Sequence, residues 1–188
     1  MENAEAALSK RRTESVAPQN VVKKSIKLWI SYIEIYNENV NDLLDASKRN
    51  LQIREDHNRE VVIDGVSRYE VKDINDIFKF MQKGNQAKVT AEHKLNEKSS
   101  RSHTVFRIEI VVSEKNMQTS RNVINTSEIN LVDLAGSEGV AKAKNQGIRL
   151  REGHNINKSL LALSNVIHKL GQKAKYINFR DSKLTRIL

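Results

Sequence analysis

The sequence predicts an α/β fold, and three hydrophobic patterns support that class. One is a largely apolar run at residues 129–134, which contains a single acidic residue and leads into a glycine turn. Continuous apolar runs of this kind are typical of strands buried on both faces. The alternation of residues 103–112 predicts a second strand, and apolar residues at helical spacing after Asp73 and Ile156 predict two helices. We therefore expect a central sheet flanked by helices.

Composition narrows the class of protein. The chain has 188 residues, of which 38% are hydrophobic and 29% are charged, so it can form one domain with a core and is not a disordered chain. It has no cysteine, which excludes disulfides and cysteine-ligated metals. No apolar run approaches the roughly 20 residues of a membrane-spanning helix. We expect a protein of the cytoplasm with no membrane partner.

The first half of the chain divides into a leader and several short elements. Residues 1–24 are polar and contain the only proline, so we expect a disordered or weakly structured leader, followed by a domain at residues 25–188. Residues 26–36 predict a strand buried on both faces. Residues 51–54 and 61–65 flank a polar stretch and predict a hairpin.

A helix is predicted between an acidic cap at Asp73 and Gly84, where we expect it to end. Its apolar stripe consists of Ile74, Ile77, Phe78 and Met81. Residues 88–98 show no periodicity, which predicts a loop. Residues 121–132 predict a strand that follows the alternating one, so both strands deliver their flanking residues to the same crevice.

The last third of the chain predicts a loop at residues 140–147 and two helices. The first helix runs from about residue 152 to Gly171. Its stripe consists of Ile156, Leu160, Leu163, Ile167 and Leu170. The second helix is expected to be capped by Asp181. It is expected to turn Leu184, Ile187 and Leu188 inward and Lys183 and Arg186 outward.

Positive charge is concentrated in the same third. The formal net charge of the chain is +9, and residues 139–188 hold the whole excess, with eleven basic side chains and two acidic ones. Such a field favours an acidic partner surface, although a solvated basic face is an equally good reading of the charge alone. The candidates for contact are Lys142, Lys144, Lys158, Lys169, Lys173, Lys175, Arg180, Lys183 and Arg186. Nucleic acid is not favoured, because the region has two aromatic residues and no recognised motif.

Two polar stretches have the composition of a phosphate sensor. Asp133 ends the apolar run where a metal would lie, and Gly136 can bring its backbone N–H close to a phosphate oxygen. Upstream, two hydroxyls lie beside Arg101, which could pair with Glu138. Taken singly, these residues also fit plainer roles, as loop caps, a turn former and a surface ion pair.

Together the stretches resemble the two nucleotide switches of the kinesin motor family. The resemblance is carried by NEKSSRSH at residues 96–103 and DLAGSE at residues 133–138. It continues in SYIEIYNE at 31–38, in INKSL at 156–160 and in FRDSKLTRIL at 179–188, all in the family's order. The residues around 149–153 and 177–179 are similar to those of the centromere-associated (CENP-E-like, kinesin-7) branch.

The resemblance implies a partial P-loop NTPase fold with a mixed sheet, with ATP and Mg²⁺ as ligands and microtubules (tubulin) as the partner. It implies that Ser100 and Asp133 hold Mg²⁺, Asp133 through water. Asn96 and Ser99 would approach the γ-phosphate, and Gly136 would sense it through its amide. Arg101 and Glu138 would close the two switches over the attacking water.

One expected motif is not in the sequence. A phosphate-cradling loop needs G-x-x-x-x-G-K-[ST], and none of the seven glycines begins one. We therefore expect the middle of a motor domain, without the leading strands and the P-loop. Lys88 stands where the family has arginine, and lysine lacks the planar fork of that side chain. Three hypotheses follow: an ATP-hydrolysing motor represented in part, a microtubule-binding chain that does not hydrolyse ATP, and a piece that does not fold stably alone.

Overall fold

The computed structural model describes residues 22–93, 101–116, 119, 122–136 and 148–188. The chain forms two compact units, which are described separately. The smaller comprises Met1–Ile26 and Val112–Asn125, and its described part consists of the ends of three strands, with an ion pair of 3.0 Å between Lys24 and Glu114. The larger comprises Lys27–Val111 and Thr126–Leu188 and contains all the predicted site residues that the structure describes.

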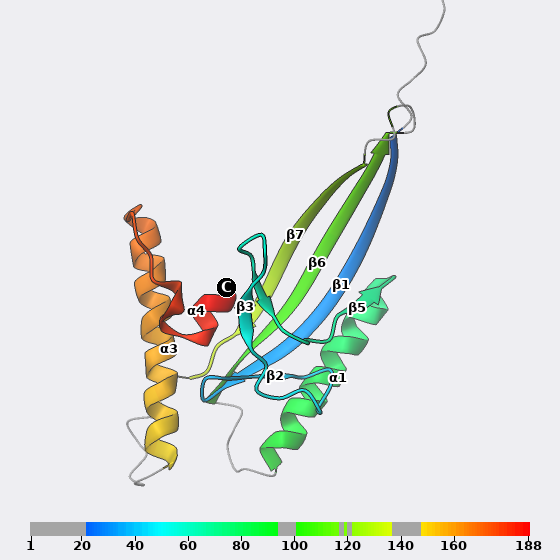
Figure 1. The fold of residues 1–188 in the computed structure, drawn as a ribbon. Coiled ribbons are helices and arrows are strands. Elements are labelled where there is room, and N and C mark those ends of the chain that lie inside the picture. Colours follow the sequence, from blue (N-terminus) through cyan, green and yellow to red (C-terminus); the bar gives the residue numbers. More distant parts are fainter. Residues whose placement is uncertain (1–21, 94–100, 117–118, 120–121, 137–147) are drawn as a thin grey trace, which may run out of the picture. The chain divides into compact units, whose positions relative to one another are not determined.

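The main sheet has five strands in the order β2-β1-β6-β7, with β5 also paired to β1 (Figure 1). Its strands are β1 (Val22–Tyr36), β2 (Asn39–Asp42), β5 (Tyr69–Val71), β6 (Ser102–Asn116) and β7 (Asn122–Asp133). β1 pairs antiparallel with β2 and with β5, and β6 runs opposite to both of its neighbours. The α/β class is confirmed, but the described strands form an antiparallel sheet where the resemblance implied a mixed one.

The predicted hairpin is confirmed. β3 (Ile53–Glu55) pairs antiparallel with β4 (Val61–Ile63) in a separate two-stranded sheet. The first strand of the main sheet begins at Val22, inside the stretch predicted as a leader, and residues 1–21 lie outside the described part of the chain.

The core lies on both faces of β1, as predicted for this strand. Four consecutive residues, 32–35, are buried. Ile33 and Ile35 pack on one face with Leu184 of the last helix, whereas Ile30 and Tyr32 pack on the other with Phe106 and residues of the first helix. Helices therefore cover both faces of the sheet at this strand, because alternate side chains of a strand point to opposite sides.

The first helix, α1 (Ile74–His93), is longer than predicted. Asp73 caps it as expected, since its carboxylate accepts the backbone N–H of Asp76 at 3.0 Å. The expected end at Gly84 is wrong. A Cβ at Gly84 would lie 2.1 Å from the Tyr32 ring, so this glycine permits close packing of α1 on β1 and does not end the helix. Residues 88–93 are consequently helical, where a loop was predicted.

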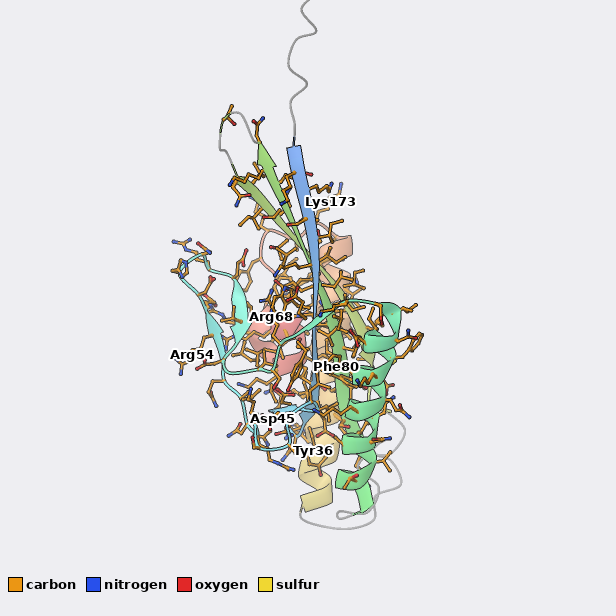
Figure 2. All side chains as sticks on the ribbon, turned by 90° about the vertical axis from the view of Figure 1, so that its right-hand side faces the viewer. Tyr36, Asp45, Arg54, Arg68, Phe80 and Lys173 are labelled. Atoms are coloured by element: carbon orange, nitrogen blue, oxygen red, sulfur yellow. The ribbon has the colours of Figure 1, made fainter. Side chains whose placement is uncertain are left out.

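Part of the predicted stripe of α1 faces solvent. Ile77 and Met81 pack against the core, but the side chains of Ile74 and Phe78 are about 60% exposed. Phe80, labelled in Figure 2, takes a core position instead and stacks on Tyr69 of β5 with ring centroids 4.9 Å apart. The helical period was read correctly, and the buried face is rotated from the predicted one.

The second long helix, α3 (Ile148–Gly171), starts about one turn earlier than predicted and ends at Gly171 as predicted. Its stripe differs from the prediction, since Ile167 and Leu170 are more than half exposed. The buried positions among residues 154–171, whose side chains the structure describes, are Ile156, Ser159, Ala162 and Val166. Small and polar residues therefore face the core, which a search for large apolar side chains does not find.

The last helix is short and its cap differs from the prediction. A 3₁₀ turn, η2 (Phe179–Asp181), precedes α4 (Lys183–Ile187). Ser182 caps α4 by accepting the backbone N–H of Thr185 at 3.1 Å, so the predicted cap at Asp181 is wrong. Leu184 and Ile187 are buried as expected, whereas Leu188 is 44% exposed.

The strand β7 corrects the prediction of an apolar strand buried on both faces. Its side chains are exposed from Asn122 to Asp133, except for the half-buried Asn130. Ile129 and Leu131 are each nearly half exposed. Among the described strands β7 pairs with β6 alone and forms the edge of the sheet. Its side chains are exposed because neither of the two core clusters that cover β1 includes a described residue of β7.

Candidate functional site

The start of β6 and the end of β7 meet at a buried hydrogen bond. The backbone N–H of Ala135 donates to Nδ1 of His103 at 3.0 Å, and both residues are at most 5% exposed. This contact brings together the two stretches that the sequence singled out, since His103 ends NEKSSRSH and Ala135 lies inside DLAGSE. The two stretches are therefore adjacent at these two residues, and the crevice expected beside them stays a prediction.

The same histidine also contacts α3. Its Nε2 lies 2.7 Å from the hydroxyl of Ser159, and that hydroxyl donates to the carbonyl of Ile156 at 2.8 Å. Burial lowers the pKa of His103 below its ordinary value of 6.5, and this effect exceeds the opposing one of the Asp133 carboxylate. The ring is therefore neutral at pH 7.

Asp133 lies at the end of β7 with its side chain 72% exposed. Lys88 of α1 reaches it with Nζ 3.2 Å from Oδ2, and the lysine side chain is only 14% exposed. The lysine thus keeps an ionic contact to this carboxylate through one nitrogen and one oxygen. The carboxylate remains accessible to a hydrated cation because most of its surface faces solvent.

Several predicted nucleotide contacts lie outside the described residues: Asn96, Ser99, Ser100 and Glu138. The proposed Arg101–Glu138 ion pair therefore stays a prediction. Arg101 itself is half-buried and directly precedes β6, and Gly136 is half-buried and follows Ala135. The described members of the predicted site thus lie at the facing ends of β6 and β7.

The basic residues predicted to contact a partner cluster on α3, η2, α4 and the segment between them, and these elements pack against one another (Figure 1). Lys158, Lys173, Lys175 and Arg180 are exposed, while Lys169, Lys183 and Arg186 are half-buried. Lys142 and Lys144 lie outside the described residues. Lys173 stands on the exposed turn after α3 (Figure 2).

Two of these cations are less available to a partner than the others. The guanidinium of Arg180 pairs with the carboxylate of Glu55 on β3. Arg186 has a buried Nε for which the described part of the chain offers no hydrogen-bond partner. The expectation that Arg186 points outward is therefore wrong for its Nε, and the better-placed cations are Lys158, Lys173 and Lys175.

The sequence analysis did not predict a turn between β1 and β2 that contacts both α3 and α4. Asn37 and Glu38, between β1 and β2, have positive φ angles of 52° and 58°. The Glu38 carboxylate accepts the backbone N–H of Lys183 at 2.9 Å, and the side chain of Asn155 donates to that of Asn37. The available signal was the Asn-Glu pair between two strands, since asparagine tolerates this backbone conformation.

Arg107 of β6 is a second position that the sequence did not reveal. Its guanidinium donates to the Asn130 side chain at 3.0 Å and to the carbonyl of Ile187 at 3.1 Å. It thereby ties β7 and α4 to β6. The only signal was a charged residue within the alternating strand.

A cavity of about 790 Å³ lies beside α4. Its lining includes Arg107, Glu128, Phe179 and Arg186, and none of the predicted nucleotide contacts. Size alone therefore does not identify it as the nucleotide site.

Comparisons with known proteins agree on one family. A model of the kinesin motor domain matches residues 5–188 of this chain. Kinesin-like protein KIN-7L of Oryza sativa subsp. japonica is 44% identical over 173 residues, which cover 90% of this chain and 27% of that protein. Centromere-associated protein E of Homo sapiens is 45% identical over 166 residues, which cover 86% of this chain and 6% of that protein.

A solved structure gives the same result for the fold. The structure of a fast kinesin, described for its ATPase mechanism and its interactions with microtubules, superimposes with a TM-score of 0.74 at 39% identity. The match covers 92% of this chain and 47% of that one. The chain thus spans about half of the solved motor and a smaller part of the curated relatives.

Proposed function

Because the chain belongs to the kinesin motor domain family, we propose that it carries the nucleotide-switch and track-binding portion of an ATP-dependent microtubule motor. The observation that carries the proposal is the junction at His103. There His103, at the start of β6, contacts both Ala135 after β7 and Ser159 of the helix that bears Lys158. A motor needs such a junction, because occupancy of a phosphate site has to change the position of a track-binding element.

The exposed cations support microtubules as the partner. Lys158, Lys173 and Lys175 lie on α3 and the turn that follows it, with their charges available to an acidic surface such as that of tubulin. Lys142, Lys144, Lys169, Arg180, Lys183 and Arg186 complete the proposed set. The proposed location is the cytoplasm, on the microtubule cytoskeleton.

The proposed ligands are ATP and Mg²⁺. Magnesium commonly takes one or two protein oxygens, several waters and substrate phosphates. The exposed Asp133 carboxylate fits that role through water, and the Ser100 hydroxyl would be the second protein ligand. Bound ATP would supply the phosphoryl group, while Asn96, Ser99 and the Gly136 amide would position it and Arg101 with Glu138 would enclose it.

Microtubule co-sedimentation tests the partner. We expect the chain to pellet with microtubules and to dissociate as salt is raised, since exposed charges are screened. The double variant Lys173→Ala and Lys175→Ala should bind several-fold more weakly. A matched variant, Lys72→Ala with Lys79→Ala, removes two exposed charges elsewhere and should bind as the wild type does. Binding that ignores salt, or equal losses in both variants, would exclude the proposed surface.

A nucleotide titration distinguishes the proposed motor function from the alternative hypothesis, in which the chain binds microtubules without hydrolysing ATP. The 188-residue sequence contains no phosphate-cradling motif, and this favours the alternative hypothesis for these residues taken alone. A fluorescent ATP analogue with Mg²⁺ should bind and lose affinity in Asp133→Ala if the switch residues suffice. Microtubule binding without nucleotide binding would support the alternative hypothesis.

A further inference from the structure

The contacts of His103 define a continuous chain of hydrogen bonds with a fixed direction. The Ala135 N–H donates to Nδ1, so that nitrogen carries a lone pair and no proton. In the neutral ring the proton is then on Nε2, which donates to the Ser159 hydroxyl at 2.7 Å. That hydroxyl donates in turn to the Ile156 carbonyl at 2.8 Å. Each donor in the chain has one acceptor.

We propose that His103 is a positioning residue whose Nε2–H tautomer locks the backbone that precedes Gly136 to helix α3. The proposal deepens the proposed function, because it assigns the link through which the phosphate-sensing turn would move the track-binding helix. The lock itself depends only on the three hydrogen bonds and can be tested without nucleotide or microtubules.

Burial makes this chain of bonds selective for one arrangement. His103 is 3% exposed and Ser159 is 1% exposed, so water does not replace a lost partner at either residue. Ser159 also lies in the buried stripe of α3, between Ile156 and Ala162, and its hydroxyl makes two hydrogen bonds there. These bonds satisfy a polar group that burial would otherwise leave unpaired.

The two ends of this chain of hydrogen bonds lie beside residues of the proposed nucleotide site and track-binding surface. Ala135 directly precedes Gly136, and Ser159 directly follows the exposed Lys158. A displacement of the Gly136 turn breaks the bond to Nδ1 unless His103 and α3 follow. Since proteins leave few buried polar groups unpaired, the three elements are expected to move as one.

Amide hydrogen exchange of Ala135, followed by NMR on the 188-residue chain, tests the lock directly. Ser159→Ala removes the far end of the chain of bonds without touching Ala135. We expect it to speed exchange of the Ala135 amide several-fold, because the imidazole is no longer held in place. Ser164→Ala, at an exposed serine of the same helix, should leave that rate unchanged. An unchanged rate in Ser159→Ala overturns the proposal.

Two substitutions of the histidine separate its two nitrogens. Asparagine places an oxygen near the position of Nδ1, so His103→Asn should keep Ala135 protected while losing the link to α3. Glutamine places a donor near the position of Nε2, so His103→Gln should keep the link to Ser159 and leave Ala135 exchanging fast. The side-chain ¹⁵N shifts of the wild-type histidine give a check that needs no variant, and a protonated Nδ1 in the neutral ring would rule the lock out.

Microtubule co-sedimentation of the same proteins tests whether this link to α3 affects binding to the track. We expect Ser159→Ala to bind several-fold more weakly than the wild type and Ser164→Ala to bind equally well. A wild type that does not bind microtubules removes the proposed function, while the exchange result still decides the lock. A wild type that binds, with Ser159→Ala binding equally well, shows that α3 does not transmit the position of Ala135 to the track and overturns the consequence.

Discussion

Strands β1 and β7 are both rich in apolar residues, yet they have opposite environments. Ile30, Ile33 and Ile35 of β1 are at most 2% exposed, whereas Ile129 and Leu131 of β7 are nearly half exposed. β1 has strands on both edges and helices on both faces, while β7 pairs only with β6 among the described strands. The difference teaches that an apolar run indicates a strand but does not determine how much of it is buried.

Truncation of one isoleucine in each strand should give the largest contrast. Ile35→Ala removes a side chain that packs with Val105 and Leu184, and we expect a loss of about 2–5 kcal/mol in the free energy of unfolding. Ile129→Ala, at a position 47% exposed, should cost less than about 1 kcal/mol. Denaturant unfolding followed by circular dichroism measures both. Equal losses would mean that β7 is covered in solution. A transition that is not cooperative in the wild type would favour the hypothesis that the chain does not fold stably alone.

The contact between α1 and β1 can be tested at Gly84. A Cβ there would meet the Tyr32 ring at 2.1 Å, so Gly84→Ala should destabilise the fold by about 1–3 kcal/mol, offset in part by the better helix propensity of alanine. Gly171→Ala is the matched control, because no atom lies within 4 Å of its added Cβ. Thermal unfolding compares the two, and a neutral Gly84→Ala would mean that α1 packs differently on β1.

Acid should weaken the buried region through His103. Because burial lowers its pKa in the fold, the unfolded chain binds the proton more tightly and stability rises with pH between the two pKa values. The contribution is therefore complete above pH 6.5 and is lost as pH falls below that value toward the folded pKa. The difference in unfolding free energy between the wild type and His103→Asn, measured from pH 7.5 to pH 5, should shrink. A constant difference would contradict a neutral buried imidazole.

The smallest effect on stability is expected on the edge strand. Leu131→Lys places a charge on an exposed edge, where lysine opposes pairing with other chains. We expect the unfolding free energy to change by less than about 0.5 kcal/mol and the aggregation onset concentration, measured by light scattering, to rise.

Local sequence patterns predicted the positions of most helices and strands but rarely which face of each is buried. Alternation predicted β6 at residues 103–112, and the observed strand is Ser102–Asn116. Helical spacing predicted α1 and α3, but the buried stripe of α3 runs through Ser159 and Ala162. Those small residues are buried, and periodicity of large apolar side chains does not detect them. The cap of α4 was misplaced by one residue, because Asp181 and Ser182 are both good capping residues.

The candidate site was likewise predictable from the sequence only in part. The order and spacing of the motifs were sufficient to predict Asp133, Gly136 and Arg101 as members of a nucleotide site, and their roles there stay predictions. Neither composition nor spacing indicated that His103 would bond both Ala135 and Ser159, or that Glu38 would hold the N-terminus of α4.

The sequence by itself determined the family, the class of fold, the position of most strands and helices, and the concentration of positive charge after residue 139. Tertiary structure decided which face of each helix is buried, that β7 is an edge strand, and that one imidazole joins three elements. The physical reason is range. Propensity, periodicity and motif spacing act within a few turns of the chain, whereas burial and the hydrogen bonds of His103 depend on residues 32 and 56 positions away.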